Sequence, residues 1–327
     1  MGCFREAGSA DPGFDGSTVK SRGMTTSPAE GPTGGRSQPR AAAVTMARDE
    51  ADMLPRWVQY YGGQFGVDNL LVIDDGSVDG STENLPCQRY RLPAGPTKLP
   101  WVAMRRKLVN GFARALLACY DVVVFSDVDE FLVPDPRRYD GLLDYVNKTG
   151  DRSVVAPLAV NVLHDARLEP ALDPEQPVLA QRSLVKFVPG MCKPLIKRVP
   201  ADWSAGLHGI SAPFEIDRDL LLVHLKYYDT AFLAAVARQR RAVNEQDDRG
   251  GAASAWTLSA EELASRLRSW VELPAGEEVE EFDPSEPDLS AVVSAHDSGF
   301  YRSVGSQLSA MEESPLRRLP QHWRNAL

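Results

Sequence analysis

The chain is poor in cysteine and has no long hydrophobic run. Its four cysteines lie far apart and form no Cys-x-x-Cys pair, which disfavours a disulfide framework or a zinc site and favours free thiols in a reducing compartment. The longest apolar runs, such as Leu220–Val223, are far too short to span a bilayer. The amino terminus lacks the apolar core of a signal peptide. We therefore expect a cytoplasmic protein without a transmembrane segment, with peripheral membrane association left open.

An excess of positive charge is also missing, because the formal net charge is -9. That balance argues against a general nucleic-acid-binding protein. No Gly-x-x-x-x-Gly-Lys-[Ser/Thr] loop occurs, which disfavours a P-loop NTPase, and no Gly-x-Gly-x-x-Gly follows a strand, which disfavours a Rossmann dehydrogenase. At 327 residues, 43% of them hydrophobic and 25% charged, the chain has the composition of a soluble protein with one large domain or two small ones.

Three parts of the chain differ in composition. Residues 1–40 are rich in Gly, Pro, Ser and Thr and show no periodic apolar pattern, so we predict a disordered tail. Residues 41–250 carry the strand and helix patterns of a folded α/β domain. Residues 251–327 are predicted to form a helical extension with an acidic linker, since Glu277 to Asp288 contains no basic residue.

The beginning of the domain has the pattern of a parallel βαβ unit. A strand is predicted at 41–47, a helix that begins near Pro55, and a second strand at 69–75. A later helix over 99–120 leads into the β-branched run Val122 to Phe125, which is typical of a strand buried on both faces. We therefore predict an α/β fold with a mostly parallel, Rossmann-like sheet flanked by helices.

Carboxylates follow three of these strands. They are Asp49 and Glu50, then Asp74 and Asp75, and then Asp127, Asp129 and Glu130. Carboxyl ends of parallel strands meet at one edge of the sheet, so the acids are expected to line a single crevice. Asp127 and Asp129, one residue apart, suit a hard divalent cation that stabilises the charge on a departing diphosphate.

Basic residues lie on the helix predicted just before the acidic strand. They are Arg105, Arg106, Lys107 and Arg114. A solvated basic face is the ordinary interpretation of such charges. The functional alternative is that one of them reaches the diphosphate of a nucleotide, and Lys107 is the candidate chosen for that contact.

Three motifs together resemble a known family. They are Ala47-Arg-Asp-Glu50 leading into Leu54-Pro-Arg-Trp57, Val72-Ile-Asp-Asp-Gly-Ser-Val-Asp-Gly-Ser81, and Phe125-Ser-Asp-Val-Asp-Glu-Phe-Leu132. Their order and spacing resemble glycosyltransferases of the GT-A (nucleotide-diphospho-sugar transferase) fold, in the family-2-like and family-92-like branch with an Asp-x-Asp-Glu-Phe motif. The resemblance covers residues 41–230. It implies a nucleotide-sugar donor, usually a UDP-sugar, with Mn²⁺ or Mg²⁺, and a glycan or other hydroxyl acceptor.

The resemblance also implies roles for the acids at the first two strand ends. Asp49 stands where many relatives have Asn, and Glu50 matches the family. These two residues, with Asp74 or Asp75, would contact the uridine.

The third strand end and two histidines complete the implied site. Asp127 and Asp129 would hold the metal and the diphosphate, and His224 is a candidate third metal ligand. A histidine on a core strand is more often structural. His208 is a candidate for the acceptor site.

An inverting transferase needs a carboxylate base that takes the proton of the acceptor hydroxyl. Glu215, Asp217 and Asp229 lie in the expected half of the chain, and Glu130 lies beside the metal. The sequence does not choose among these four, and a retaining reaction stays open.

Two other functions fit part of the pattern. A haloacid-dehalogenase-like phosphatase also has Asp-x-Asp after an apolar strand, but here two strands precede the motif and no Gly-Asp-x-x-x-Asp follows it. A catalytically inactive, sugar-binding transferase-like domain is the non-enzymatic alternative. The intact acids at all three strand ends argue against it.

Asp127→Ala or Asp129→Ala is expected to abolish metal-dependent turnover of the donor while the fold survives, because each removes a carboxylate from the predicted cation site. Turnover is followed as Mn²⁺-dependent release of UDP, and folding by circular dichroism. Full activity in either variant would contradict the assignment of that aspartate to the site.

Overall fold

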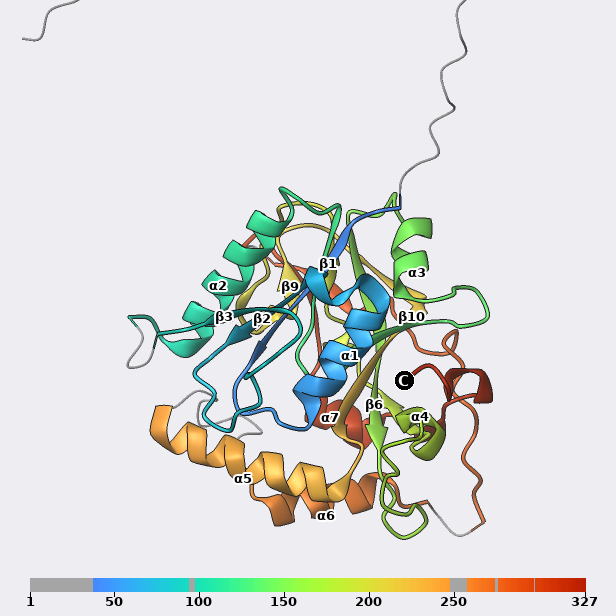
Figure 1. Cartoon of the computed structure of the whole chain (residues 1–327). Helices are drawn as coiled ribbons and strands as arrows, with labels where there is room; N and C mark the ends of the chain where they lie inside the picture. Colours follow the sequence, from blue (N-terminus) through green and yellow to red (C-terminus); the bar gives the residue numbers. More distant parts are fainter. Residues whose placement is uncertain (1–37, 94–97, 248–257, 274–275, 297) are drawn as a thin grey trace, which may run out of the picture. The chain divides into compact units, whose positions relative to one another are not determined.

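The computed structural model describes residues 38–93, 98–247, 258–273, 276–296 and 298–327 (Figure 1). The larger sheet contains β1 (Ala41–Ala47), β2 (Leu70–Asp74), β3 (Gln88–Arg91), β4 (Val122–Phe125), β5 (Glu130–Pro134), β6 (Val154–Leu163), β7 (Leu184–Phe187), β8 (Ile196–Lys197), β10 (Glu215–Tyr227) and β13 (Arg317–Arg318). The smaller sheet contains β9 (Gly209–Ile210), β11 (Val293–Ala295) and β12 (Tyr301–Ser303). The helices are α1 (Met53–Phe65), α2 (Trp101–Leu116), α3 (Leu142–Lys148), α4 (Val178–Gln181), α5 (Thr230–Asp247), α6 (Ala260–Trp270) and α7 (Gln307–Glu313).

Four strands form the parallel part of the larger sheet. Their order is β3-β2-β1-β4, which is the order of one half of a doubly wound fold. The order of the strands reverses between β1 and β4. β2 and β3 are added on one side of β1, whereas β4 pairs with β1 on its other side. The predicted α/β fold with helices flanking the sheet is confirmed, and ligands in such folds bind outside this reversal point.

The sheet continues beyond β4 with mixed pairing. β8 runs antiparallel to both β4 and β6, and β7 runs antiparallel to β6. The long strand β10 lies parallel to β6 and antiparallel to β5. This mixed part brings a strand from late in the chain next to the acidic segment.

Helices cover both faces of the parallel strands, as Figure 1 shows for α1 and α2. All seven residues of β1 are buried, and alternate side chains belong to separate clusters. Ala41 and Ala43 pack with the α1 side, whereas Val44 packs with the α2 side. Trp57 and Tyr61 of α1 are fully buried, which confirms their predicted place in the core.

Aromatic groups of α1 also fix the backbone of the acidic segment. The Trp57 indole N–H donates to Ser126 Oγ at 2.9 Å. The Tyr61 hydroxyl donates to the carbonyl of Glu130 at 3.1 Å and accepts from the amide of Leu132 at 3.1 Å. These bonds attach the turn between β4 and β5 to a rigid helix.

The carboxyl-terminal part contains strands as well as the expected helices. β13 pairs antiparallel with β7, and β12 pairs with β9. Trp323 near the end of the chain is fully buried. Residues 1–37 of the predicted tail lie outside the described residues. Among the described helices, none is long and apolar enough to cross a membrane.

Gly190→Ala is expected to lower the free energy of unfolding by about 1–3 kcal/mol. A Cβ at Gly190 would lie 2.3 Å from the carbonyl oxygen of Gly305, and a backbone atom cannot rotate away. Chemical denaturation of both proteins measures the loss. Gly63→Ala is the control, because a Cβ at Gly63 would have nothing within 4 Å of it. That helical substitution should be neutral or stabilising, and equal losses in both variants would contradict the explanation.

Candidate active site

The acidic segment after β4 forms a tight turn into β5. The amide of Glu130 donates to the carbonyl of Asp127 at 3.0 Å, and the amide of Ser126 donates to the carbonyl of Val44 at 3.2 Å. The turn therefore begins where β4 leaves β1. The side chains of Asp129 and Glu130 are buried, and their charge requires compensation there.

Asp127 forms ion pairs with two cations. Its Oδ1 pairs with the guanidinium of Arg105, and its Oδ2 lies 3.5 Å from Lys193 Nζ. Arg105 is held over the rings of Trp101 and Phe125, 5.5 and 5.6 Å from their centroids. Burial would by itself raise the pKa of Asp127, but Arg105 and Lys193 outweigh it and hold that pKa below its usual value.

Lys193 is the buried cation shared by two acids of the turn. Its ammonium group also pairs with Glu130, and both side chains are buried. Burial opposes the charged form of Lys193, yet Glu130 and Asp127 together raise its pKa. Lys193 lies in the connection between β7 and β8, so antiparallel strands late in the sheet deliver its charge.

Asp129 faces His224 of β10. Asp129 Oδ2 lies 3.3 Å from His224 Nε2 and 3.5 Å from a guanidinium nitrogen of Arg240 in α5. Burial would raise the pKa of Asp129, but His224, Arg240 and Lys193 hold it far below its usual value. His224 pairs with Glu130 in the register of β10 and β5, so the antiparallel pairing positions the imidazole.

The hydrogen bonds of His224 decide which ring nitrogen is available. The amide of Asn161 donates to Met311 Sδ at 3.0 Å, which directs Asn161 Oδ1 toward His224 Nδ1 at 2.6 Å. An amide oxygen only accepts, so Nδ1 carries a proton and Nε2 is the ring nitrogen that faces Asp129. At 3.3 Å from Asp129 Oδ2, Nε2 can share either a proton or a bound cation with that carboxylate.

This donor set fits a divalent cation. One ligand atom each from Asp129, Glu130 and His224 can be chosen so that all lie within 4.8 Å of one another, and all three residues are buried. Asn161 orients the imidazole from behind, as outer-shell groups do for metal-binding histidines. Asp127, which the sequence analysis paired with Asp129 on the metal, lies outside this group and faces Arg105 and Lys193.

Glu50 follows β1 and lies close to the acids that follow β4. Burial raises the pKa of Glu50 to about 8, Arg240 opposes that rise, and Asp129 and Asp127 add to it. The charges of Asp129 and Asp127 raise the pKa of Glu50 because the ends of β1 and β4 are adjacent in the sheet. The structure thus brings these three predicted acids to one place.

The other acids at the first two strand ends mainly build loops. Asp49 has a positive φ of 54°, and its Oδ1 accepts the amides of Val78 and Asp79 at 2.6 and 3.2 Å. Asp74 is fully buried and accepts the amide of Ser77 and the hydroxyl of Thr82. In this conformation the oxygens of Asp74 are used inside the loop, and the uridine contact of Asp74 or Asp75 stays a prediction.

Asp75 remains at the edge of the site. Its Oδ2 accepts the indole N–H of Trp101 at 2.9 Å. Trp101 in turn lies under Arg105, which pairs with Asp127. Asp75 is thus connected through an aromatic ring to the acidic turn.

Three predicted site residues lie elsewhere. Lys107 is exposed and lines a groove with Met104 and Phe112 on α2, so Arg105 is the basic residue of this helix that reaches the acids. Glu215 and Asp217 lie at the start of β10, whereas His224 lies near its end. They are separated from His224 by about 20 Å along the strand, since seven or more strand residues lie between them, and their role as the base stays a prediction.

Asp217 has a structural role at its own end of β10. It accepts the hydroxyl of Tyr145 at 2.7 Å and forms an ion pair with Arg152. Asp229 caps α5 through the amide of Phe232 at 2.8 Å. Neither carboxylate is aimed at the acidic turn.

The site also contains Lys193, Arg240 and Asn161, which no sequence pattern predicted there. Arg240 lies within α5, which is attached near the site because Gln239 donates to the carbonyl of Asp49 at 2.7 Å. Lys193 and Asn161 stand in no motif. Only the pairing of strands distant in sequence brings them to the acids.

Comparisons with known proteins are limited. No protein-family model and no curated protein matches the chain. A solved structure of a mycobacterial protein is similar at 20% identity, over 40% of this chain and 44% of that chain, with a TM-score of 0.27. Glucosyl-3-phosphoglycerate synthase from Mycobacterium tuberculosis, in complex with Mn²⁺, UDP-glucose and phosphoglyceric acid, is similar at 19% identity, over 37% of this chain and 44% of that chain, with a TM-score of 0.26. The chain thus spans less than half of these chains, and such TM-scores carry no inference about activity.

Glu50→Gln is expected to become more stable than the wild type as the pH rises from 5 to 8. The folded state holds the Glu50 proton until its pKa of about 8, whereas the unfolded state releases it near the ordinary glutamate value of 4.5. The wild type therefore loses stability with rising pH through this range, by about 3–4 kcal/mol relative to the variant. Denaturant titrations at pH 5, 6.5 and 8 measure the difference.

Glu313→Gln at an exposed position serves as the matched control and should show no such trend. A difference between Glu50→Gln and the wild type that stays constant from pH 5 to 8 would contradict the raised pKa.

Proposed function

We propose that the protein is a metal-dependent glycosyltransferase that moves a sugar from a nucleotide-sugar, of the UDP-sugar class, to a hydroxyl acceptor. One observation carries the proposal. At the reversal point of the parallel sheet, the ends of β1, β4 and β10 place Glu50, Asp129 and His224 together with the cations Lys193 and Arg240. A nucleoside diphosphate with its cation needs both kinds of charge at such a crevice.

Asp129, His224 and Glu130 would hold the Mn²⁺ or Mg²⁺. Bound there, the cation would neutralise the charge that develops on the departing diphosphate. His224 supplies the Nε2 lone pair that its bond to Asn161 leaves available. Asp129 supplies a carboxylate that stays ionised, because its neighbours lower its pKa.

Arg105, Lys193 and Arg240 are proposed to bind the diphosphate oxygens. They come from α2, the connection before β8, and α5, and each lies against an acid of the turn. Charge-assisted bonds to phosphate are stronger than neutral ones, and guanidinium groups match phosphate geometry. These three replace Lys107 in the donor site.

The loops after β1 and β2 are proposed to receive the nucleoside. Ser77 and Ser81 hydroxyls accept the amides of Asp49 and Glu50 at 3.1 and 3.3 Å, so the two loops form one unit. Asp75 is the acid of the second loop that lies next to Trp101 and Arg105. The same proposal has three further parts: residues 41–250 form the catalytic domain, the protein belongs to the Asp-x-Asp-Glu-Phe branch, and its location is cytoplasmic.

A panel of nucleotide-sugars that includes UDP-glucose, tested by thermal shift with and without Mn²⁺, is the direct experiment. At least one donor should raise the apparent stability only with the metal, by about 2.7 kcal/mol at a hundredfold excess over Kd. His224→Gln should weaken Mn²⁺-dependent binding by at least about tenfold, because it removes the imidazole ligand.

His322→Gln is the control, since His322 lies beside Asp135 and not at the acidic turn. Release of inorganic phosphate from simple phosphate esters without sugar transfer would instead support the phosphatase alternative. Failure to bind both UDP and Mn²⁺ would contradict the transferase and leave a binding domain.

A further inference from the structure

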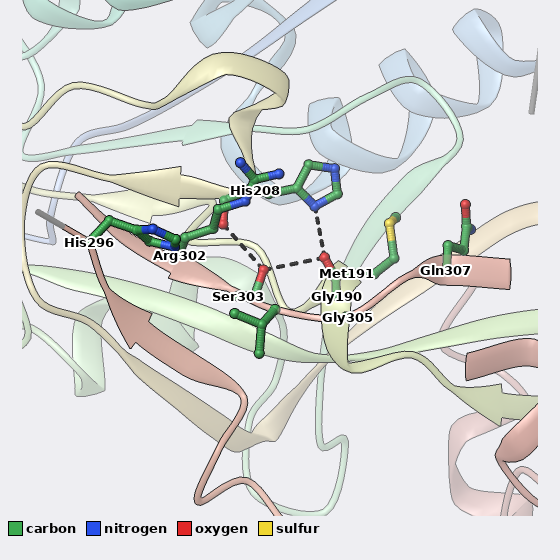
Figure 2. Close-up of a pocket in the computed structure, with 9 residues that line it drawn as sticks. Gly190, Met191, His208, His296, Arg302, Ser303, Gly305 and Gln307 are labelled. Atoms are coloured by element: carbon green, nitrogen blue, oxygen red, sulfur yellow. Dashed lines mark hydrogen bonds between the residues drawn. The ribbon is translucent and has the colours of Figure 1, made fainter. Parts of the chain in front are cut away.

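A pocket of about 480 Å³ lies between the connection that carries Lys193 and the carboxyl-terminal part (Figure 2). It is lined by Gly190, Met191, His208, His296, Arg302, Ser303, Val304, Gly305 and Gln307. Its residues come from the connection between β7 and β8, from the segment before β9, and from the carboxyl-terminal part. None of the described residues that line it is acidic, in contrast to the neighbouring turn.

Two glycines, Gly190 and Gly305, line the pocket and lie against each other. A Cβ at Gly190 would lie 2.3 Å from the carbonyl oxygen of Gly305, and Gly305 has a positive φ of 116°. The Gly190 carbonyl accepts from His208 Nδ1 at 2.7 Å and from the Ser303 hydroxyl at 3.2 Å, as Figure 2 shows. The close backbone contact thus fixes the carbonyl that orients the imidazole.

This bond also fixes the tautomer of His208. A carbonyl only accepts, so Nδ1 carries the proton and Nε2 presents a lone pair. Burial, with Lys193 next in importance, lowers the pKa of His208 to about 4, and Arg302 adds to the decrease. Near neutral pH the ring is therefore a hydrogen-bond acceptor without charge.

The pocket is coupled to the proposed donor site by two residues. Gln307 lines the pocket and its Nε2 lies 3.4 Å from His224 Nδ1. Lys193 pairs with Asp127 and Glu130, and its charge also lowers the pKa of His208. A molecule in the pocket would therefore lie beside the acids and cations of the turn.

We propose that this pocket is the acceptor subsite and that it takes a hydroxyl compound bearing a carboxylate or phosphate group. Arg302 pairs with the anion, and His208 Nε2 accepts a hydrogen bond from the hydroxyl. Arg302 is the cationic side chain of the lining and none of the described lining residues is acidic, so an anion in the pocket would meet a cation and no carboxylate of the lining. The proposal rests on the transferase function and names the acceptor class for it.

Calorimetric titration of the full chain with glucose 6-phosphate, glucuronate and neutral glucose tests the pocket directly. At least one charged sugar should bind about tenfold or more tightly than glucose, since a charge-assisted bond exceeds that factor. The tighter of the two charged sugars identifies phosphate or carboxylate as the preferred anion. Arg302→Met should remove the preference.

Arg268→Met, at an exposed position of α6, is the matched control and should keep the preference. His208→Phe should weaken charged and neutral sugars by the same factor, because it removes the hydroxyl contact and leaves Arg302 in place. Equal binding of all three sugars, no binding, or an unchanged preference in Arg302→Met would overturn the proposal. Mn²⁺-dependent donor binding is measured in the same variants, so failure of the pocket is distinguished from failure of the transferase function.

Discussion

The ion pairs of Lys193 with Glu130 and Asp127 are the constraint on which the site depends. Carboxylates at the end of an apolar strand are costly to bury unless cations and hydrogen bonds compensate them. Arg105 and Arg240 complete the compensation from α2 and α5. The acids are therefore stable only where three distant parts of the chain meet, and that meeting point is the crevice of the sheet.

The compensating cations also connect stability with ligand binding. The groups that neutralise the acidic turn are those that a diphosphate would engage. His224 also takes part in these interactions. Asn161 Oδ1 accepts a hydrogen bond from His224 Nδ1, so His224 Nε2 faces Asp129. A rigid support holds this arrangement, since α1 binds the backbone of the turn through Trp57 and Tyr61.

Charge is distributed unequally between the turn and the adjoining pocket. The turn concentrates carboxylates, whereas the described lining of the pocket has Arg302 and neutral His208 and no acid. Lys193 pairs with Glu130 of the turn and lowers the pKa of His208 in the pocket, and Gln307 of the pocket contacts His224. This separation matches the proposed function, in which a cation-dependent donor binds at the turn and an anionic acceptor binds in the pocket.

The sequence by itself determined the α/β class, the βαβ unit, the buried face of α1 and the strand ends that carry the acids. These features depend on local periodicity and on neighbours in the chain, which a linear pattern records. Only the tertiary structure decided that Asp74 is used inside a loop, that Glu215 and Asp217 lie far from His224, and that Arg105 rather than Lys107 reaches the turn. Asn161 came to the site through the parallel pairing of β6 with β10, and Lys193 through the antiparallel pairing of β7 and β8 with their neighbours. The register between distant strands places side chains that no local motif marks.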